Sequence, residues 1–173
     1  MEQVGYDTYC KLLDEVIKEM QGIEIPEELD VQIDLNVSTY IPDDYIKDSS
    51  QKIKVYQDIA LSRTEEDIQN VIDTIIDIYG DMPIQLENLI EIARIKELCK
   101  KNRILKISQR MNGIVFYFDA NTFKMDTLDI LLSKYKNKIK FSPGREPYIT
   151  YKIETLSDSK LLAEIKNFLT TLL

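Results

Sequence analysis

The chain has 173 residues and a mass of 20.2 kDa, and 44% of its residues are hydrophobic, so it can fold around a hydrophobic core. Its 30 acidic and 22 basic residues give a net charge of −8, which argues against nonspecific nucleic-acid binding by the surface as a whole. The absence of histidine excludes Ser-His and Cys-His nucleophile pairs, imidazole metal ligands and the usual general base near neutral pH.

The two cysteines, Cys10 and Cys99, belong to no C-x-x-C pair. We interpret them as small apolar core residues in a reducing compartment rather than as a disulfide or a zinc site. No apolar run approaches the roughly 18 residues of a membrane span, and the N-terminus lacks the pattern of a signal peptide. These features predict a cytoplasmic location.

The charges are unevenly distributed along the chain. Residues 1–93 carry 22 acids and 6 bases, a net charge of −16, whereas residues 94–173 carry 8 acids and 16 bases, a net charge of +8. Residues 64–93 contain eight acids and neither lysine nor arginine. Two interpretations stay open: the two halves neutralise each other within the fold, or the acidic half presents a face to a basic partner.

The acidic half begins with one predicted helix and one predicted strand. Apolar residues at helical spacing predict a helix over residues 9–20, ended by Gly22 and Pro26. Residues 31–37 alternate between apolar and polar, which is typical of a half-buried strand.

Three further helices are predicted before residue 102. Asp48 or Ser49 is expected to cap a helix that ends near residue 61. Thr64, followed by three acids, predicts a capped helix that Gly80 ends. The next helix, over residues 84–102, is apolar over a wide arc, and we expect it to lie deep in the core.

In the basic half, the pattern changes to short strands and helices. A Met111-Asn112-Gly113 turn predicts a hairpin between the first two strands. The predicted elements are strands 104–108 and 114–118, helix 126–135, strands 138–141 and 148–153, and helix 161–172. The predicted class is α+β: an acidic helical half followed by a basic β-hairpin/α/β/β/α half, in one compact domain.

The sequence contains no motif for catalysis or cofactor binding. There is no Gly-x4-Gly-Lys-Ser/Thr phosphate loop and no Gly-x-Ser-x-Gly elbow. The acids Asp43, Asp44 and Asp48 lack the spacing of a calcium loop, so we interpret them as a solvated turn and a helix cap. We expect no catalytic, cofactor-binding or metal-binding residue in this chain.

The helix predicted after Thr64 has an unusual polar face. Asn70, Asp73 and Asp77 lie opposite its apolar stripe, and the two carboxylates are i, i+4 neighbours. Like charges at this spacing cost an isolated helix a few tenths of a kcal/mol. Either a basic side chain from the second half relieves this repulsion, or the face serves another molecule.

Several segments resemble the C-terminal module of bacterial transcription-repair coupling factor. They are residues 4–13 (VGYDTYCKLL), 40–46 (YIPDDYI), 64–66 (TEE), 76–83 (IDIYGDMP) and 89–95 (LIEIARI). The resemblance covers essentially the whole chain and is most specific over residues 4–95. After residue 104 it rests on the order of elements.

The resemblance implies that the chain belongs to a longer parent protein, an ATP-driven double-stranded-DNA translocase of helicase superfamily 2. Such a parent displaces stalled RNA polymerase and recruits nucleotide excision repair, and its motor domains bind ATP and Mg. By this resemblance, residues 1–22 form a helix at the end of the motor-module connection. Residues 23–173 are then the C-terminal regulatory α+β domain, which has no cofactor of its own.

The resemblance also implies a partner. The family's C-terminal module docks on the parent's N-terminal UvrB-like region, covers the surface that binds UvrA and restrains the motor. Its docking surface includes acids on the helix before the Gly-x-x-Pro turn. Asp77 keeps one of them, Thr74 replaces a glutamate, and Asp73 is expected to substitute for it. The expected partner-binding residues are Asn70, Asp73, Thr74, Asp77 and Asp81.

An alternative function is nucleic-acid contact through the basic residues of 94–110 and 134–140. Tyr135 and Phe141 lie among these bases, but we expect both rings in the core rather than in a stacking platform. An independent enzyme is the weakest hypothesis. We expect neither a membrane nor a small-molecule ligand as a partner, and contacts with RNA polymerase and DNA are expected of the parent.

Overall fold

The computed structural model describes residue 16, residues 29–154 and residues 157–173. The predicted helix over residues 9–20 and Cys10 therefore lie, apart from residue 16, outside the described residues. Residue contacts divide the chain into two compact units, where the sequence predicted two halves of one domain. Of the described residues, unit 1 contains residue 16 and residues 38–94, and unit 2 contains residues 29–37, 95–154 and 157–173.

Unit 1 is helical, as predicted. It contains α2 (Ser49–Leu61), α3 (Glu65–Tyr79) and the first part of α4 (Ile84–Lys101), which continues into unit 2. The carboxylate of Asp48 caps α2 by accepting a hydrogen bond of 2.9 Å from the backbone N–H of Gln51. The core of this unit consists of Ile41, Ile46, Val55, Ile59, Ile68, Ile75, Leu86, Leu89, Ile90 and Ala93.

The start and end of α3 follow the sequence prediction. The hydroxyl of Thr64 accepts the backbone N–H of Asp67, and the carboxylate of Asp67 accepts the backbone N–H of Thr64, which completes a capping box. Hydrogen bonds that the carboxylate accepts from the backbone N–H of Arg63 and then from that of Thr64 lower the pKa of Asp67. At the other end, Gly80 has a φ of 85°, a conformation that glycine adopts without steric cost.

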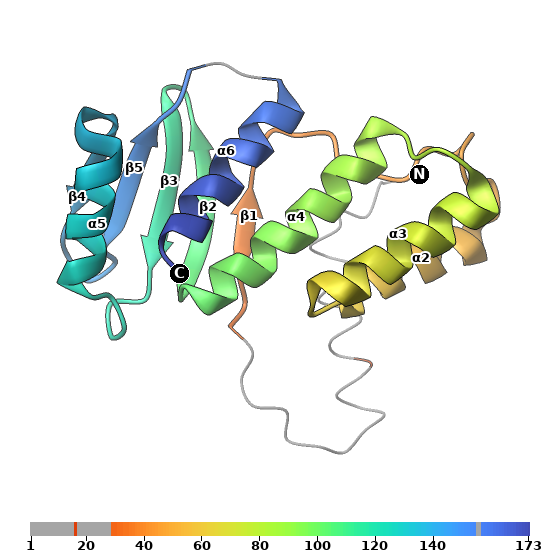
Figure 1. Ribbon diagram of the computed structural model, residues 1–173, viewed down its shortest axis with the longest axis horizontal. Coiled ribbons are helices and arrows are strands. Elements are labelled where there is room, and N and C mark those ends of the chain that lie inside the picture. Colours follow the sequence, from red (N-terminus) through yellow and green to blue (C-terminus); the bar gives the residue numbers. More distant parts are fainter. Residues whose placement is uncertain (1–15, 17–28, 155–156) are drawn as a thin grey trace. The chain divides into compact units, whose positions relative to one another are not determined.

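Unit 2 is a five-stranded mixed sheet with helices (Figure 1). The strands lie in the order β1-β2-β3-β5-β4, and β1 pairs parallel with β2 while the other pairs are antiparallel. The elements are β1 (Gln32–Asp34), β2 (Ile104–Arg110), β3 (Gly113–Phe118), α5 (Met125–Tyr135), the 3₁₀ turn η1 (Lys136–Lys138), β4 (Ile139–Ser142), β5 (Tyr148–Lys152) and α6 (Asp158–Thr171). The α+β class and the predicted hairpin are confirmed. The strand predicted over residues 31–37 is shorter, and it joins the sheet of the basic half.

Aromatic rings pack α5 and α6 against one face of this sheet. Phe168 of α6 stacks on Phe116 of β3, with 4.3 Å between ring centroids, and also contacts Tyr151 of β5. Tyr135 at the end of α5 lies edge-on to Tyr151 at 5.0 Å. Phe141 stacks on Phe123 at 5.1 Å. Tyr135 and Phe141 therefore pack against other aromatic rings, as predicted, but both are half-buried and lie at the edge of the core rather than inside it.

Candidate partner-binding site

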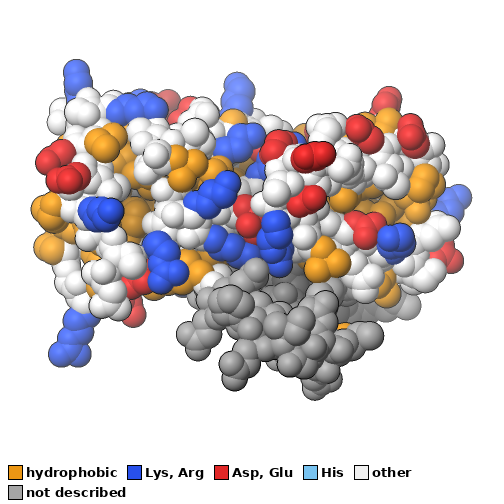
Figure 2. All heavy atoms as spheres, turned by 60° about the horizontal axis from the view of Figure 1, so that its bottom comes forward, with side chains coloured by type: hydrophobic (Ala, Val, Ile, Leu, Met, Phe, Trp, Pro, Cys, Tyr) orange, Lys and Arg blue, Asp and Glu red, His pale blue; other side chains and the backbone are white. Residues whose placement is uncertain are grey.

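All five residues predicted to bind a partner are exposed. Asn70, Asp73, Thr74 and Asp77 lie on one side of α3 at spacings of three, four and seven residues, and we call these four residues the acidic face. Asp81 lies just beyond the helix, in the turn between α3 and α4. Figure 2 shows acidic side chains gathered over the part of the surface that α2 and α3 form.

Asp73 and Asp77 lack a basic partner within their unit. None of the described Lys and Arg side chains of unit 1 forms an ion pair with either carboxylate. Asp73 accepts only a 2.8 Å hydrogen bond from the amide of Gln69, one turn earlier. The hydroxyl of Thr74 donates to the backbone carbonyl of Asn70 at 2.8 Å, so its hydrogen is directed back to its own helix.

Other acids of unit 1 do have basic partners. Arg94, whose side chain is only 19% exposed, donates from Nε to Glu65 at 3.0 Å and also pairs with Glu91. Burial opposes the charge of Arg94, but the hydrogen bonds that it donates to these two carboxylates raise its pKa. Lys54 pairs with Asp58 at 3.1 Å. Neutralisation of the acidic half by the basic half, the first of the two sequence interpretations, therefore applies to Glu65 and Glu91, whereas Asp58 is paired within the acidic half.

A groove between α2 and α3 borders the acidic face. It has a volume of about 200 Å³, and Asn70 and Thr74 form part of its rim. Ile78, which also lines it, is 63% exposed although it is a large apolar residue. The other lining residues are Gln51, Lys54, Val55, Asp58, Val71, Ile75 and Tyr79.

Sequence reasoning missed Ile78 and the contribution of α2 to the groove. Ile78 lies at the edge of the apolar stripe of α3, seven residues after Val71, and this widening of the stripe beside Thr74 was the available signal. The role of α2 could not be predicted, because it depends on how two helices pack.

The turn after the acidic face is held by aromatic side chains. The hydroxyl of Tyr45 donates to the carbonyl of Gly80 at 2.7 Å, and the ring centroids of Tyr45 and Tyr79 lie 5.9 Å apart. Burial, followed by the nearby charge of Asp81, raises the pKa of Tyr45. Because the Tyr45 hydroxyl anchors the carbonyl of Gly80, the position of Asp81 relative to α3 is defined.

The residues considered for metal binding have other roles. Asp48 caps α2, and Asp43 pairs with Lys52. In residues 29–154 and 157–173, no group of three or more Cys, Asp or Glu side chains is arranged to hold a metal ion. Cys99 is a free thiol in the core, as predicted, and burial raises its pKa. No helix of the described chain is long and apolar enough to cross a membrane.

Comparison with known proteins identifies the family. Residues 35–127 match the TRCF domain, and the chain belongs to the TRCF domain family. The resemblance noted in the sequence is thereby confirmed.

Relatives and a solved structure extend this result. Transcription-repair-coupling factor of Rickettsia prowazekii is 31% identical over 175 residues, which cover 100% of this chain and 15% of the relative. That of Staphylococcus epidermidis is 36% identical over 98 residues, which cover 56% of this chain and 8% of the relative. The crystal structure of a C-terminal domain of transcription-repair coupling factor has the same fold, with a TM-score of 0.75 and 22% identity, over 83% of this chain and 91% of that one. The chain thus spans only a small part of the two transcription-repair-coupling factors, from Rickettsia prowazekii and Staphylococcus epidermidis.

Proposed function

We propose that this chain is a non-catalytic regulatory module of a transcription-repair coupling factor, and that its acidic face docks on the N-terminal UvrB-like region of the same parent. The observation that carries this proposal is the state of Asp73 and Asp77. Both carboxylates are exposed and pair with none of the bases of residues 38–94, whereas Glu65, Glu91 and Asp58 are paired. A docking face needs unpaired charge, since a charge that is already neutralised offers a partner little.

The groove gives this docking an apolar anchor. A partner side chain that enters between α2 and α3 would bury the exposed part of Ile78, and burial of apolar surface is the main favourable term in association. Basic residues beside that anchor would reach Asp73 and Asp77. Charge then selects the partner, and the groove supplies affinity.

The consequence for the parent is restraint. A module seated on the UvrB-like region would cover the surface that UvrA binds and hold back the DNA translocase until RNA polymerase is engaged. In this proposal, ATP and Mg bind only in the parent's motor domains, and the parent acts in the cytoplasm in nucleotide excision repair. Family membership and the lack of a phosphate-loop motif in the sequence support this division of work.

A pull-down of the chain with the parent's N-terminal region tests the docking. We expect specific capture that UvrA displaces. Capture that UvrA leaves unchanged would show that the two surfaces do not overlap, and no capture would contradict the proposal.

Deletion of the module from the full-length parent tests the restraint. We expect a higher basal ATPase or translocation rate, because removal of the module would relieve the proposed restraint on the motor. An unchanged rate in a folded truncation would reduce the module to a spacer.

A further inference from the structure

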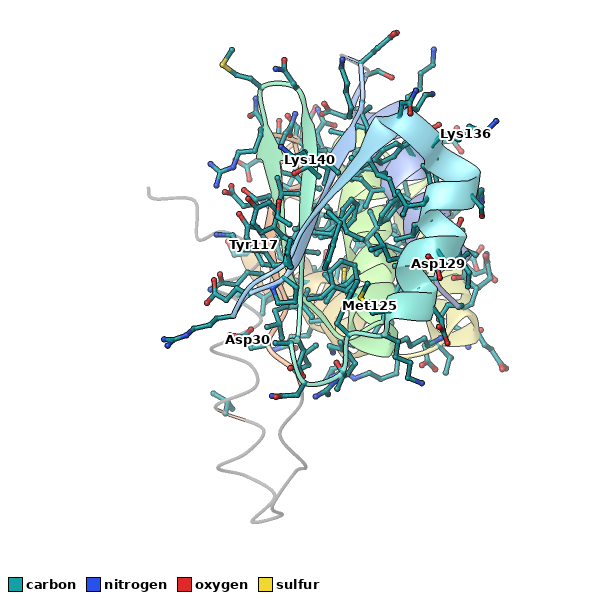
Figure 3. The ribbon with its side chains drawn as sticks, turned by 90° about the vertical axis from the view of Figure 1, so that its left-hand side faces the viewer. Asp30, Tyr117, Met125, Asp129, Lys136 and Lys140 are labelled. Carbon is teal, nitrogen blue, oxygen red and sulfur yellow. The ribbon has the colours of Figure 1, made fainter. Side chains whose placement is uncertain are left out.

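The sheet of unit 2 has one face that α5 and α6 do not cover. The rings that contact these helices, Phe116 and Tyr151, belong to one face. Side chains alternate along a strand, so their neighbours in sequence point to the other face. Figure 3 shows Tyr117 on the side of the sheet away from α5. We call this second face the open face; by register it consists of Gln32, Asp34, Lys106, Ser108, Arg110, Gly113, Val115, Tyr117, Lys140, Ser142, Tyr148, Thr150 and Lys152. Gly113, Ser108 and Val115 are buried, so a ligand would contact the other side chains of this face.

Two tyrosines lie side by side on the open face. Tyr117 of β3 and Tyr148 of β5 occupy paired register positions, and their ring centroids are 5.5 Å apart with the planes tilted by 42°. Both are only half-buried. The ammonium of Lys106 lies 5.9 Å from the Tyr117 ring centroid, so a cation accompanies the aromatic pair.

The charge of the open face is basic. Its strand residues include four bases, Lys106, Arg110, Lys140 and Lys152, and one acid, Asp34. None of the four bases forms an ion pair with a described acid of unit 2. Other bases of this unit are paired, since Lys100 lies 2.8 Å from Glu97 and Arg103 lies 3.1 Å from Asp119.

We propose that the open face binds single-stranded nucleic acid, with bases stacked on Tyr117 and Tyr148 and phosphates held by the surrounding lysines. Aromatic rings on a sheet, flanked by bases, are how many proteins bind single strands, because every base has a face that can stack. A duplex keeps its bases stacked inside, so it could use only the cations. This site shares Lys106, Arg110 and Lys140 with the alternative considered from the sequence, but its rings are different, because Tyr135 and Phe141 pack against other aromatic rings.

Fluorescence anisotropy of the full chain with a labelled oligo(dT) of about 12 nucleotides, within the usual site size, tests this proposal. The RNA counterpart oligo(U) and a duplex of equal length are the comparison probes. We expect binding to at least one single strand at low salt, and weaker binding to the duplex. The RNA and DNA probes decide which single strand the face prefers.

Two double variants separate stacking from charge. Tyr117→Leu with Tyr148→Leu keeps apolar area but removes the rings, and we expect at least about tenfold weaker binding. Lys140→Ala with Lys152→Ala should reduce the slope of log K against log salt by about 1.4, roughly 0.7 for each phosphate contact. The matched control is Lys101→Ala with Lys160→Ala, two exposed lysines on α4 and α6, and it should leave affinity unchanged.

Several results would overturn the assignment. One is that neither oligo(dT) nor oligo(U) binds, and another is that the duplex binds as tightly as the single strands. A third is that polyglutamate displaces the bound single strand when both polymers are added at equal total charge. Full affinity in a folded tyrosine variant would also overturn it. If the double tyrosine variant does not fold, the comparison of the Lys140, Lys152 variant with its control tests the proposal. Lys140 and Lys152 are both exposed, so their removal leaves the core intact.

Discussion

The double change Asp73→Ala and Asp77→Ala separates docking from stability. Both side chains are exposed, and the one hydrogen bond recorded for them is the 2.8 Å contact between Gln69 and Asp73 on the surface of α3. Alanine has a higher helix propensity than aspartate by up to about 0.7 kcal/mol, and the change also removes an i, i+4 repulsion of a few tenths of a kcal/mol. For two aspartates the gain is up to about 1.5 kcal/mol, which would raise the Tm by roughly 3–6 °C for a chain of this size.

Association should respond in the opposite direction. At the desolvated part of an interface, removal of one partner of a charge pair costs roughly 2–5 kcal/mol, against about 0–1 kcal/mol for an exposed pair. We therefore expect binding to the N-terminal region to weaken at least about tenfold, which corresponds to about 1.4 kcal/mol. Thermal unfolding followed by circular dichroism, and titration calorimetry with the N-terminal region, measure the two effects.

A matched control removes the same charge elsewhere in unit 1. Asp44→Ala with Glu87→Ala changes two exposed acids outside α3 and should leave affinity almost unchanged. Equal weakening by both double variants would show that net charge, rather than the acidic face, drives association. A clear loss of stability in the Asp73, Asp77 variant would refute the reasoning, because the acids would then stabilise the fold. If neither stability nor affinity changed, docking would occur elsewhere.

Three further predictions concern the fold. Gly113→Ala places a Cβ 2.1 Å from the backbone oxygen of Tyr151, so strands β3 and β5 must shift. Urea denaturation should show that the free energy of unfolding falls by about 1–3 kcal/mol. An unchanged denaturation midpoint would contradict this close approach. Arg94→Met should cost about 1–2 kcal/mol because it breaks two pairs at a side chain that is only 19% exposed, whereas the control Lys54→Met should cost less than about 0.5 kcal/mol; equal losses would be evidence against the role of burial. Hydrogen bonds lower the pKa of Asp67 in the folded state relative to its value of about 3.9 in the unfolded state. The contribution of Asp67 to the free energy of unfolding is therefore complete above the unfolded-state pKa and is lost as the pH falls through the lower pKa of the folded state. The Tm difference between the Asp67→Asn variant and the unsubstituted chain should therefore be constant above about pH 5 and shrink in acid. A difference that grows in acid would contradict a lowered pKa of Asp67.

Local signals predicted most of the elements of this protein. The capping box of Thr64 and Asp67 is formed by residues three apart, so its geometry depends on one helical turn. The turn at Met111-Asn112 likewise joins two neighbouring strands. The acidic face follows from helical periodicity alone, which places Asp73 and Asp77 on one side of α3. These features needed no knowledge of the rest of the chain.

Pairings between distant segments could not be predicted in this way. The strand at Gln32 alternates as an ordinary half-buried strand does, and nothing in that pattern assigns it to a parallel ladder with Lys106. For this reason the boundary between the acidic and basic halves matches the two units only in part. Residues 29–37 of the acidic half belong to unit 2 because backbone hydrogen bonds join β1 to β2. Such bonds carry no side-chain signature in the sequence.

Both candidate sites show the same division. The sequence by itself determined that α3 has an acidic side and that Tyr117 and Tyr148 lie in strands. Only the tertiary structure decided that α2 completes a groove beside Ile78, and that α5 and α6 cover the opposite face of the sheet from those tyrosines. The physical reason is that periodicity defines the two sides of an element, whereas burial of one side depends on which other element packs against it.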